Sequence, residues 1–290
     1  MAITTFIPEL WAARLLAHLD KAHVATAFVN RQYEGEIRRM GDTVHINSIG
    51  DITIGDYTAN TNMNPAETLA TSDQELVIDN AKYFNFQVDD IDRVQAAGDL
   101  IDAATQRAGY NLADVVDRAI FAVIATAATG GNVIGSAASP INLLGVSPEG
   151  AYEQLVKLRT LMVKNNVPSQ TWRVACPPDF IGLLLEDSRF VANGTDAGES
   201  RLVNGFVGRA AGFDIYETNN LPTTSSGTGT SAVSGQVVIA APAFATAFAE
   251  QIVEVEAYRP ELRFADAVKG LNVYGIKNIY PAATAKLIFN

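Results

Sequence analysis

The chain has 290 residues, of which 48% are hydrophobic and 18% are charged, and its formal net charge is −11. This charge disfavours a general nucleic-acid binder, because phosphate contacts need clustered lysine and arginine. The single cysteine, Cys176, excludes an internal disulfide framework and fits a reducing compartment. The N-terminal thirty residues lack an uncharged signal core, and the longest apolar run, Ala119–Ala128, is too short to span a bilayer. We therefore expect a soluble intracellular protein of one large or two modest domains.

The N-terminal thirty residues predict an amphipathic helix. Pro8 suits its first turn, and apolar positions from Leu10 to Val29 form one stripe. Such a helix either packs in the core or forms an arm that packs on a neighbouring subunit. Trp11 is the expected anchor in the second arrangement.

Residues 42–88 predict two long strands joined by a loop. Apolar residues alternate with polar ones at Val44, Ile46, Ile52 and Ile54, and again at Phe84, Phe86 and Val88. The loop from Gly55 to Asp73 is rich in threonine, asparagine and alanine. No lysine or arginine occurs from Gly41 to Ala81, whereas seven residues are acidic. This segment is expected either to be a solvated hairpin or to meet a basic partner.

Residues 89–129 predict one amphipathic helix, because apolar positions keep helical spacing from Ala97 to Ile124. A helix of that length spans roughly 60 Å, longer than the ball of about 50 Å that a compact chain of this size forms. Asp89, Asp90 and Asp92 lie at its expected start, where the helix dipole favours carboxylates without any metal. The pattern indicates a flattened subunit that lies beside copies of itself.

The remaining chain mixes helices with strands. One helix is expected to begin at Ser147-Pro148-Glu149, and a shorter one runs from Pro177 to Leu185. We predict strands at 172–176, 213–216, 237–239, 253–257, 271–280 and 285–289, with an exposed loop at 223–235. Strands at both ends of the chain are expected to pair and close a central inserted domain. The fold class is therefore α+β.

No enzyme signature is found. His18 and His23 are five residues apart on a predicted helix, which puts them on different faces, and His45 is the only other histidine. Cys176 has no histidine near it in sequence, so we interpret it as a small buried side chain. Glycine motifs that bind phosphate are absent. We expect no enzyme activity, no catalytic residue, no cofactor and no metal site.

Several short motifs follow one another along the chain. They are Phe6-Ile7-Pro8-Glu9-Leu10-Trp11, Gly41-Asp42-Thr43-Val44, Asp89-Asp90-Ile91-Asp92, Gly212-Phe213-Asp214-Ile215-Tyr216, Asn219-Asn220-Leu221-Pro222 and Val268-Lys269-Gly270-Leu271-Asn272-Val273-Tyr274-Gly275. In this order and spacing, the sequence resembles the major capsid proteins of tailed double-stranded DNA bacteriophages, which share the Hong Kong 97-type fold. The resemblance covers nearly the whole chain.

The resemblance implies a part for each segment. It implies an N-terminal arm at 1–40, an extended E-loop hairpin at 41–88, a peripheral domain at 89–139 and 246–290 with its spine helix at 89–129, and an axial domain at 140–245. Copies are expected to self-assemble as pentamers and hexamers into an icosahedral head that encloses double-stranded DNA without sequence-specific binding. The expected location is the virion, after assembly in the host cytoplasm.

The resemblance also implies partners. Because the E-loop has no lysine, we expect non-covalent locking of the shell, and we expect a separate scaffolding protein and a portal but no membrane partner. Acidic E-loop residues, including Asp51 and Asp56, are expected to contact basic groups of a neighbour. The candidates are Arg38, Arg39, Lys82, Arg259 and Arg263. Two alternatives stay open: an encapsulin-like cellular nanocompartment, and an enzyme whose site is assembled from distant residues.

Overall fold

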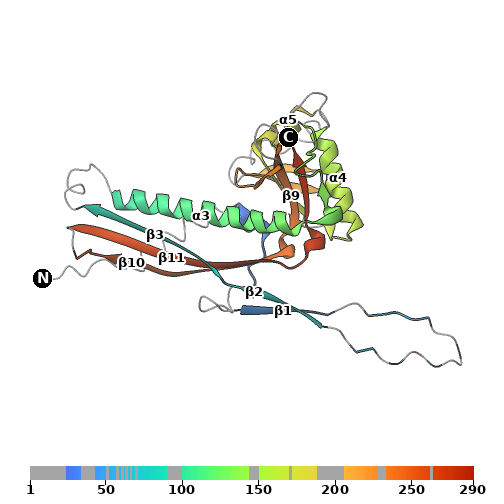
Figure 1. Cartoon of the computed structure of the whole chain (residues 1–290), viewed down its shortest axis with the longest axis horizontal. Helices are drawn as coiled ribbons and strands as arrows, with labels where there is room; N and C mark the ends of the chain where they lie inside the picture. The colour runs from blue at the N-terminus through green and yellow to red at the C-terminus, as the bar shows by residue number, and fades with distance from the viewer. Residues whose placement is uncertain are drawn as a thin grey trace.

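The computed structural model shows an elongated subunit built around two sheets (Figure 1). A long sheet with one helix along it forms one part, and a compact sheet with two helices forms the other. The described residues are 24–33, 43–49, 52–56, 59, 62, 65, 67–68, 71–89, 100–143, 150–169, 172–187, 206–226, 233–261 and 264–290. No helix in this part of the chain combines the length and hydrophobicity of a membrane-spanning segment.

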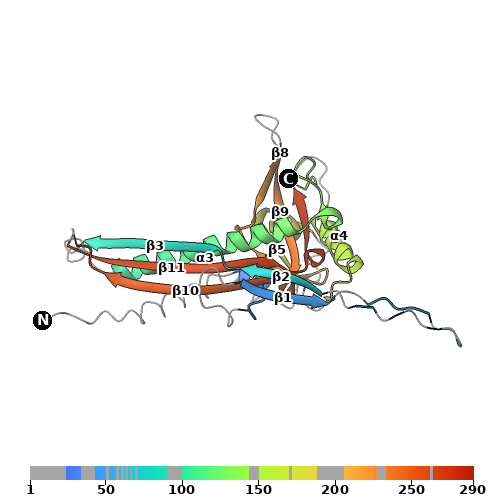
Figure 2. The same ribbon diagram turned by 60° about the horizontal axis from the view of Figure 1, so that its bottom comes forward.

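Three antiparallel strands form the long sheet. Their order is β10 (Thr246–Tyr258), β11 (Ala265–Asn278) and β3 (Asn80–Asp89). Helix α3 (Leu100–Ala127) lies along one face of this sheet (Figures 1 and 2). Strand alternation puts Phe84, Phe86 and Val88 on that face, where they pack against a buried group that includes Leu112 of the helix.

Helix α3 is the predicted long helix, but its predicted start is wrong. Asp89 is the last residue of β3 and pairs with Ala265 of β11, because the strand alternation continues that far. Asp90 and Asp92 lie outside the described residues. The described helix has 28 residues and is about 42 Å long.

The end of α3 is held by a side chain from the compact sheet. Lys286 donates from Nζ to the carbonyl oxygen of Ala125 at 2.8 Å. A cation at this position is favoured by the negative end of the helix dipole. Partial burial lowers the pKa of Lys286.

The predicted hairpin is confirmed in its first half only. Strand β1 (Thr43–Ile49) pairs antiparallel with β2 (Thr71–Val77), so the return strand begins earlier than expected. Phe84, Phe86 and Val88 belong to β3 and pair with the long sheet instead. Ile52 and Ile54 lie beyond the end of β1.

The compact sheet mixes parallel and antiparallel strands. Its order is β4 (Val133–Ile134), β12 (Ala285–Phe289), β9 (Val233–Pro242), β5 (Trp172–Cys176), β7 (Phe213–Glu217) and β6 (Phe206–Ala210), with β8 (Thr223–Ser226) paired to β9. Short 3-10 turns lie at η1 (Ala25–Phe28), η3 (Gly130–Asn132), η6 (Ala243–Ala245) and η7 (Pro281–Ala283).

Both faces of the compact sheet are covered. Helices α4 (Ala151–Lys164) and α5 (Pro178–Glu186) cover one face, where Leu158 and Phe180 join the sheet residues in one core. The other face packs on the C-terminal half of α3 and on η1, through residues such as Phe121. Helix α3 therefore contacts both sheets and joins the two parts of the subunit.

Several predicted elements differ from the structure. The loop expected at 223–235 contains β8 and the start of β9, since threonine-rich segments pair readily as strands. Strand β12 was expected to return to the sheet of the long helix, but it lies between β4 and β9. The N-terminal helix does not extend through Phe28, because η1 is a single 3-10 turn. Helix α4 begins at Ala151, and residues 147–149 lie outside the described residues.

Candidate inter-subunit surfaces

The hairpin of β1 and β2 is anchored on one face. Val44, Leu76 and Ile78 are no more than 6% exposed and pack against Ala247 and Val273 of the long sheet. In Figure 1 the two strands run below the compact part of the subunit and away from the long sheet. The base of the ribbon is therefore fixed, while its far end leaves the body.

Beyond its strands the hairpin exposes apolar and acidic side chains together. Ile52 and Ile54 have 65% and 95% of their surface exposed, and Asp56 beside them is also exposed. The amide of Thr53 donates to Oε2 of Glu67 at 3.1 Å, so the two sides of the hairpin still meet here. Hydrogen bonds from the side chain and backbone of Thr53 lower the pKa of Glu67. Exposed apolar side chains with polar groups around them are typical of a surface that another molecule covers.

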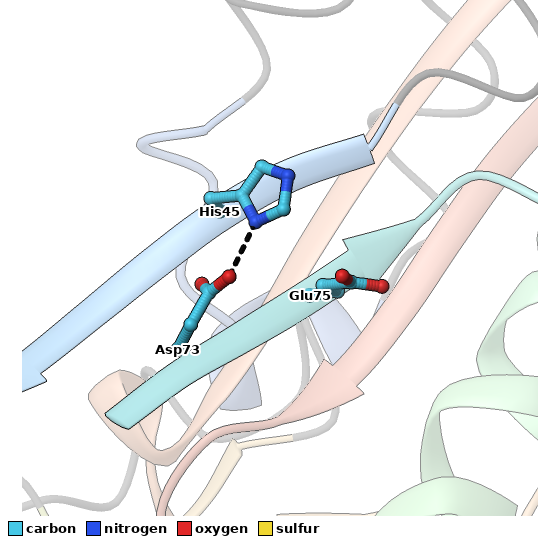
Figure 3. A group of neighbouring side chains, drawn as sticks. All are labelled: His45, Asp73 and Glu75. Atoms are coloured by element: carbon cyan, nitrogen blue, oxygen red, sulfur yellow. Dashed lines mark hydrogen bonds and ion pairs between the residues drawn. The ribbon is translucent and has the colours of Figure 1, made fainter. Parts of the chain in front are cut away.

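Three side chains gather on the outer face of the ribbon (Figure 3). His45 comes from β1, and Asp73 and Glu75 come from β2. Nδ1 of His45 lies 2.6 Å from Oδ2 of Asp73, and one nitrogen or oxygen atom from each residue lies within 4.8 Å of the others. The sequence alone does not reveal this group, because it depends on the strand register.

A second feature ties the N-terminal segment to both sheets. Oδ1 and Oδ2 of Asp117, which is 2% exposed, accept the backbone N–H groups of Ala25 at 3.2 Å and Val24 at 3.3 Å. Nη1 of Arg173 in β5 donates to the carbonyl oxygen of Ala27. The ring of Phe28 packs edge-on against Phe121 of α3 and Tyr216 of β7, with both centroid distances 5.5 Å. Residues 24–28 are therefore held in place where α3 meets the compact sheet.

The expected contact residues are distributed over several elements. Lys82 is exposed on β3, Arg259 is exposed just after β10, and Asp56 is exposed in the hairpin. Trp11, Arg38, Arg39, Asp51 and Arg263 lie outside the described residues. A contact between these groups across subunits stays a prediction.

The single cysteine does not have the surroundings of a nucleophile. Cys176 is fully buried, and burial together with the charge of Glu217 raises the pKa of its thiol. A neighbouring pocket of about 290 Å³ is lined by Asp179, by Thr223 and by apolar or amide groups, with no histidine, cysteine or lysine. These residues offer no acid–base pair.

Comparison with known proteins assigns the family. A family model for phage capsid proteins matches residues 72–287. The chain belongs to the phage capsid protein family. No curated protein sequence gives a significant match.

Solved structures agree with this family. A chain from Mycobacterium phage Che8 is 30% identical, with a TM-score of 0.67, and the match covers 100% of this chain and 98% of that chain. A chain from the capsid of cyanophage P-SCSP1u is 17% identical, with a TM-score of 0.69 and coverage of 91% and 86%. A chain from the mature capsid of bacteriophage PhiM1 is 16% identical, with a TM-score of 0.63 and coverage of 86% and 82%.

The phage capsid protein is thus a structural subunit with the Hong Kong 97-type fold that self-assembles into the icosahedral shell of a virion. The fold also resembles a virus-like particle from Pyrococcus furiosus at 13% identity and a TM-score of 0.57, which shows the fold alone. The family match and the relative at 30% identity favour the phage capsid over the encapsulin-like alternative. A structural role is also consistent with the expectation that the protein is not an enzyme.

Proposed function

We propose that subunits form pentamers and hexamers in which the acidic hairpin of one subunit lies over the next. In this arrangement the long sheet with α3 is the peripheral domain, and the compact sheet with α4 and α5 is the axial domain. The observation that carries the proposal is the anchored ribbon whose far end exposes Ile54 and Asp56. A neighbour would bury the isoleucine and pair the carboxylate.

The charge distribution supports a contact between the hairpin and basic groups of the neighbouring subunit. Seven acidic residues and no lysine or arginine occupy Gly41–Ala81, so the hairpin cannot neutralise itself. Lys82, Arg259 and the residues Arg38, Arg39 and Arg263 are the proposed partners. Exposed ion pairs contribute only about 0.2–1 kcal/mol each. These contacts therefore determine where the hairpin lies on its neighbour more than they stabilise the shell. The strength comes from apolar burial repeated over many identical interfaces.

The net negative charge of the subunit also affects how it is expected to contact the packaged DNA. A subunit of net charge −11 does not adhere to packed DNA, so we expect the enclosed genome to be held without sequence-specific contacts. A separate scaffolding protein and a portal would direct assembly in the host cytoplasm. Non-covalent contacts would lock the shell, since the hairpin has no lysine to form a cross-link.

Charge reversal tests the hairpin contact. Arg259→Glu and Arg263→Glu are expected to abolish shells in negative-stain electron microscopy while the isolated subunit keeps its circular dichroism spectrum. Lys277→Glu changes the same charge at another exposed position of the long sheet and serves as the control. Normal particle yields from both arginine variants would show that these groups do not receive the hairpin. Absence of shells from the unmodified chain, alone or with its candidate scaffold, would contradict the assembly proposal itself.

A further inference from the structure

The outer face of the β1–β2 ribbon carries one nitrogen donor and two oxygen donors, none of which is among the contact residues named above. We propose that His45, Asp73 and Glu75 bind one divalent transition-metal ion, with Zn²⁺ as the best fit. Imidazole and carboxylate groups are the usual nitrogen and oxygen ligands of zinc. The proposal goes beyond the assembly contacts above and does not depend on them.

The strand register brings the three donors together. His45 pairs directly with Glu75 across the two strands, and Asp73 lies two residues from Glu75 on the same face of β2. Directly opposed and diagonal neighbours are within reach of each other's side chains in an antiparallel pair. One side chain from β1 and two from β2 therefore converge above the ribbon (Figure 3).

The distances are close to those of a metal site. The donor atoms lie within 4.8 Å of one another, whereas ligands about 2.0–2.2 Å from a tetrahedral ion are roughly 3.4 Å apart. All three side chains are exposed, so small rotations can close the difference. Nδ1 of His45 faces the Asp73 carboxylate at 2.6 Å, so these two atoms would have to move apart by about 0.8 Å to admit an ion. Binding would place the ion between these two groups, and three protein ligands would leave a fourth position for water.

Two further observations favour a cation here. With a neutral imidazole the group carries two negative charges, and no lysine or arginine lies between Gly41 and Ala81 to balance them. The opposite face of the same strands is fixed by Val44 and Leu76, which are buried against the long sheet. The backbone positions of the ligands are therefore set before the ion arrives. The bound ion would link β1 to β2 and stabilise the ribbon.

Calorimetric titration of the full-length, unassembled chain with Zn²⁺ tests the proposal. We expect one ion per chain, with affinity at least tenfold lower in each of His45→Gln, Asp73→Asn and Glu75→Gln. Asp79→Asn, which removes an exposed carboxylate just after β2 and outside the group, should bind like the unmodified chain. Substituted Co²⁺ should give the visible absorption of a tetrahedral complex, and that absorption should be lost in the His45 variant.

Three results would overturn the proposal. The first is no Zn²⁺ binding by the unmodified chain, and the second is binding that survives in all three ligand variants. The third is equal binding of Mg²⁺, which prefers octahedral oxygen sites and would indicate simple charge screening. Shell formation is measured separately by electron microscopy, so failure of the metal site leaves the assembly proposal standing.

Discussion

The close approach of Phe84 to Gly270 allows a direct test of how the long sheet is packed beneath α3. A Cβ atom added at Gly270 would lie 2.3 Å from Cε1 of the Phe84 ring. Non-bonded carbon atoms normally stay about 3.5–4.0 Å apart, so the ring would have to move by roughly 1 Å or more. The ring stacks on Phe86 at 6.1 Å and contributes to the group under the helix. Overpacking of this kind costs about 1–3 kcal/mol, which is the expected loss of unfolding free energy in Gly270→Ala.

A double-mutant cycle isolates the contact. Phe84→Leu removes the ring, so Gly270→Ala added to that variant should be neutral or stabilising by about 0.5 kcal/mol, because alanine is favoured over glycine within a strand. Gly275→Ala is the comparison, since its Cβ would meet the backbone oxygen of Val77 at 2.6 Å and the Phe84 substitution cannot relieve that clash. Urea unfolding of the unassembled subunit, followed by circular dichroism, measures each free energy. A coupling energy near zero would refute this packing.

Three other predictions test separate parts of the subunit. Gly182→Ala should raise the thermal midpoint by the equivalent of about 0.5–1 kcal/mol, because a Cβ there meets nothing within 4 Å in the middle of α5; a lower midpoint would contradict this. Cys176 should react with a thiol reagent only in denaturant, because burial raises its pKa; rapid labelling of the native chain would show that it is accessible. Asp117→Asn should weaken the anchoring of η1 by about 1.5–3 kcal/mol through loss of a charged acceptor, seen as faster amide exchange at Ala25, and unchanged exchange would be the opposing result.

The sequence predicts an element well when its first and last residues are determined by their immediate neighbours in the chain. The strand at 172–176 and the strand at 285–289 coincide with β5 and β12, because these mainly apolar segments are bounded by proline or by polar residues. The partner of a strand is not a local property. The alternation at Phe84 and Phe86 marks a strand, but it does not tell the hairpin from the long sheet. For the same reason β12 was placed in the wrong sheet.

In the candidate surfaces too, features that depend on local sequence are predictable, and features that depend on distant residues are not. The acidity of the hairpin follows from composition, and its exposure follows from the loop residues around Asp56. The group formed by His45, Asp73 and Glu75 requires the register across a loop of more than twenty residues, which no local rule fixes. The acceptor of the N-terminal turn, Asp117, lies 92 residues from Ala25. A partner so far away along the chain cannot be inferred from the residues around Asp117.

The place of β12 has a consequence for how the subunit is made. This strand lies between β4 and β9, so that side of the compact sheet stays incomplete until residues 285–289 have left the ribosome. Strands β10 and β11 precede it along the chain and can pair earlier. A nascent chain therefore holds an unfinished compact sheet, with one edge of β9 unpaired, until β12 has been made.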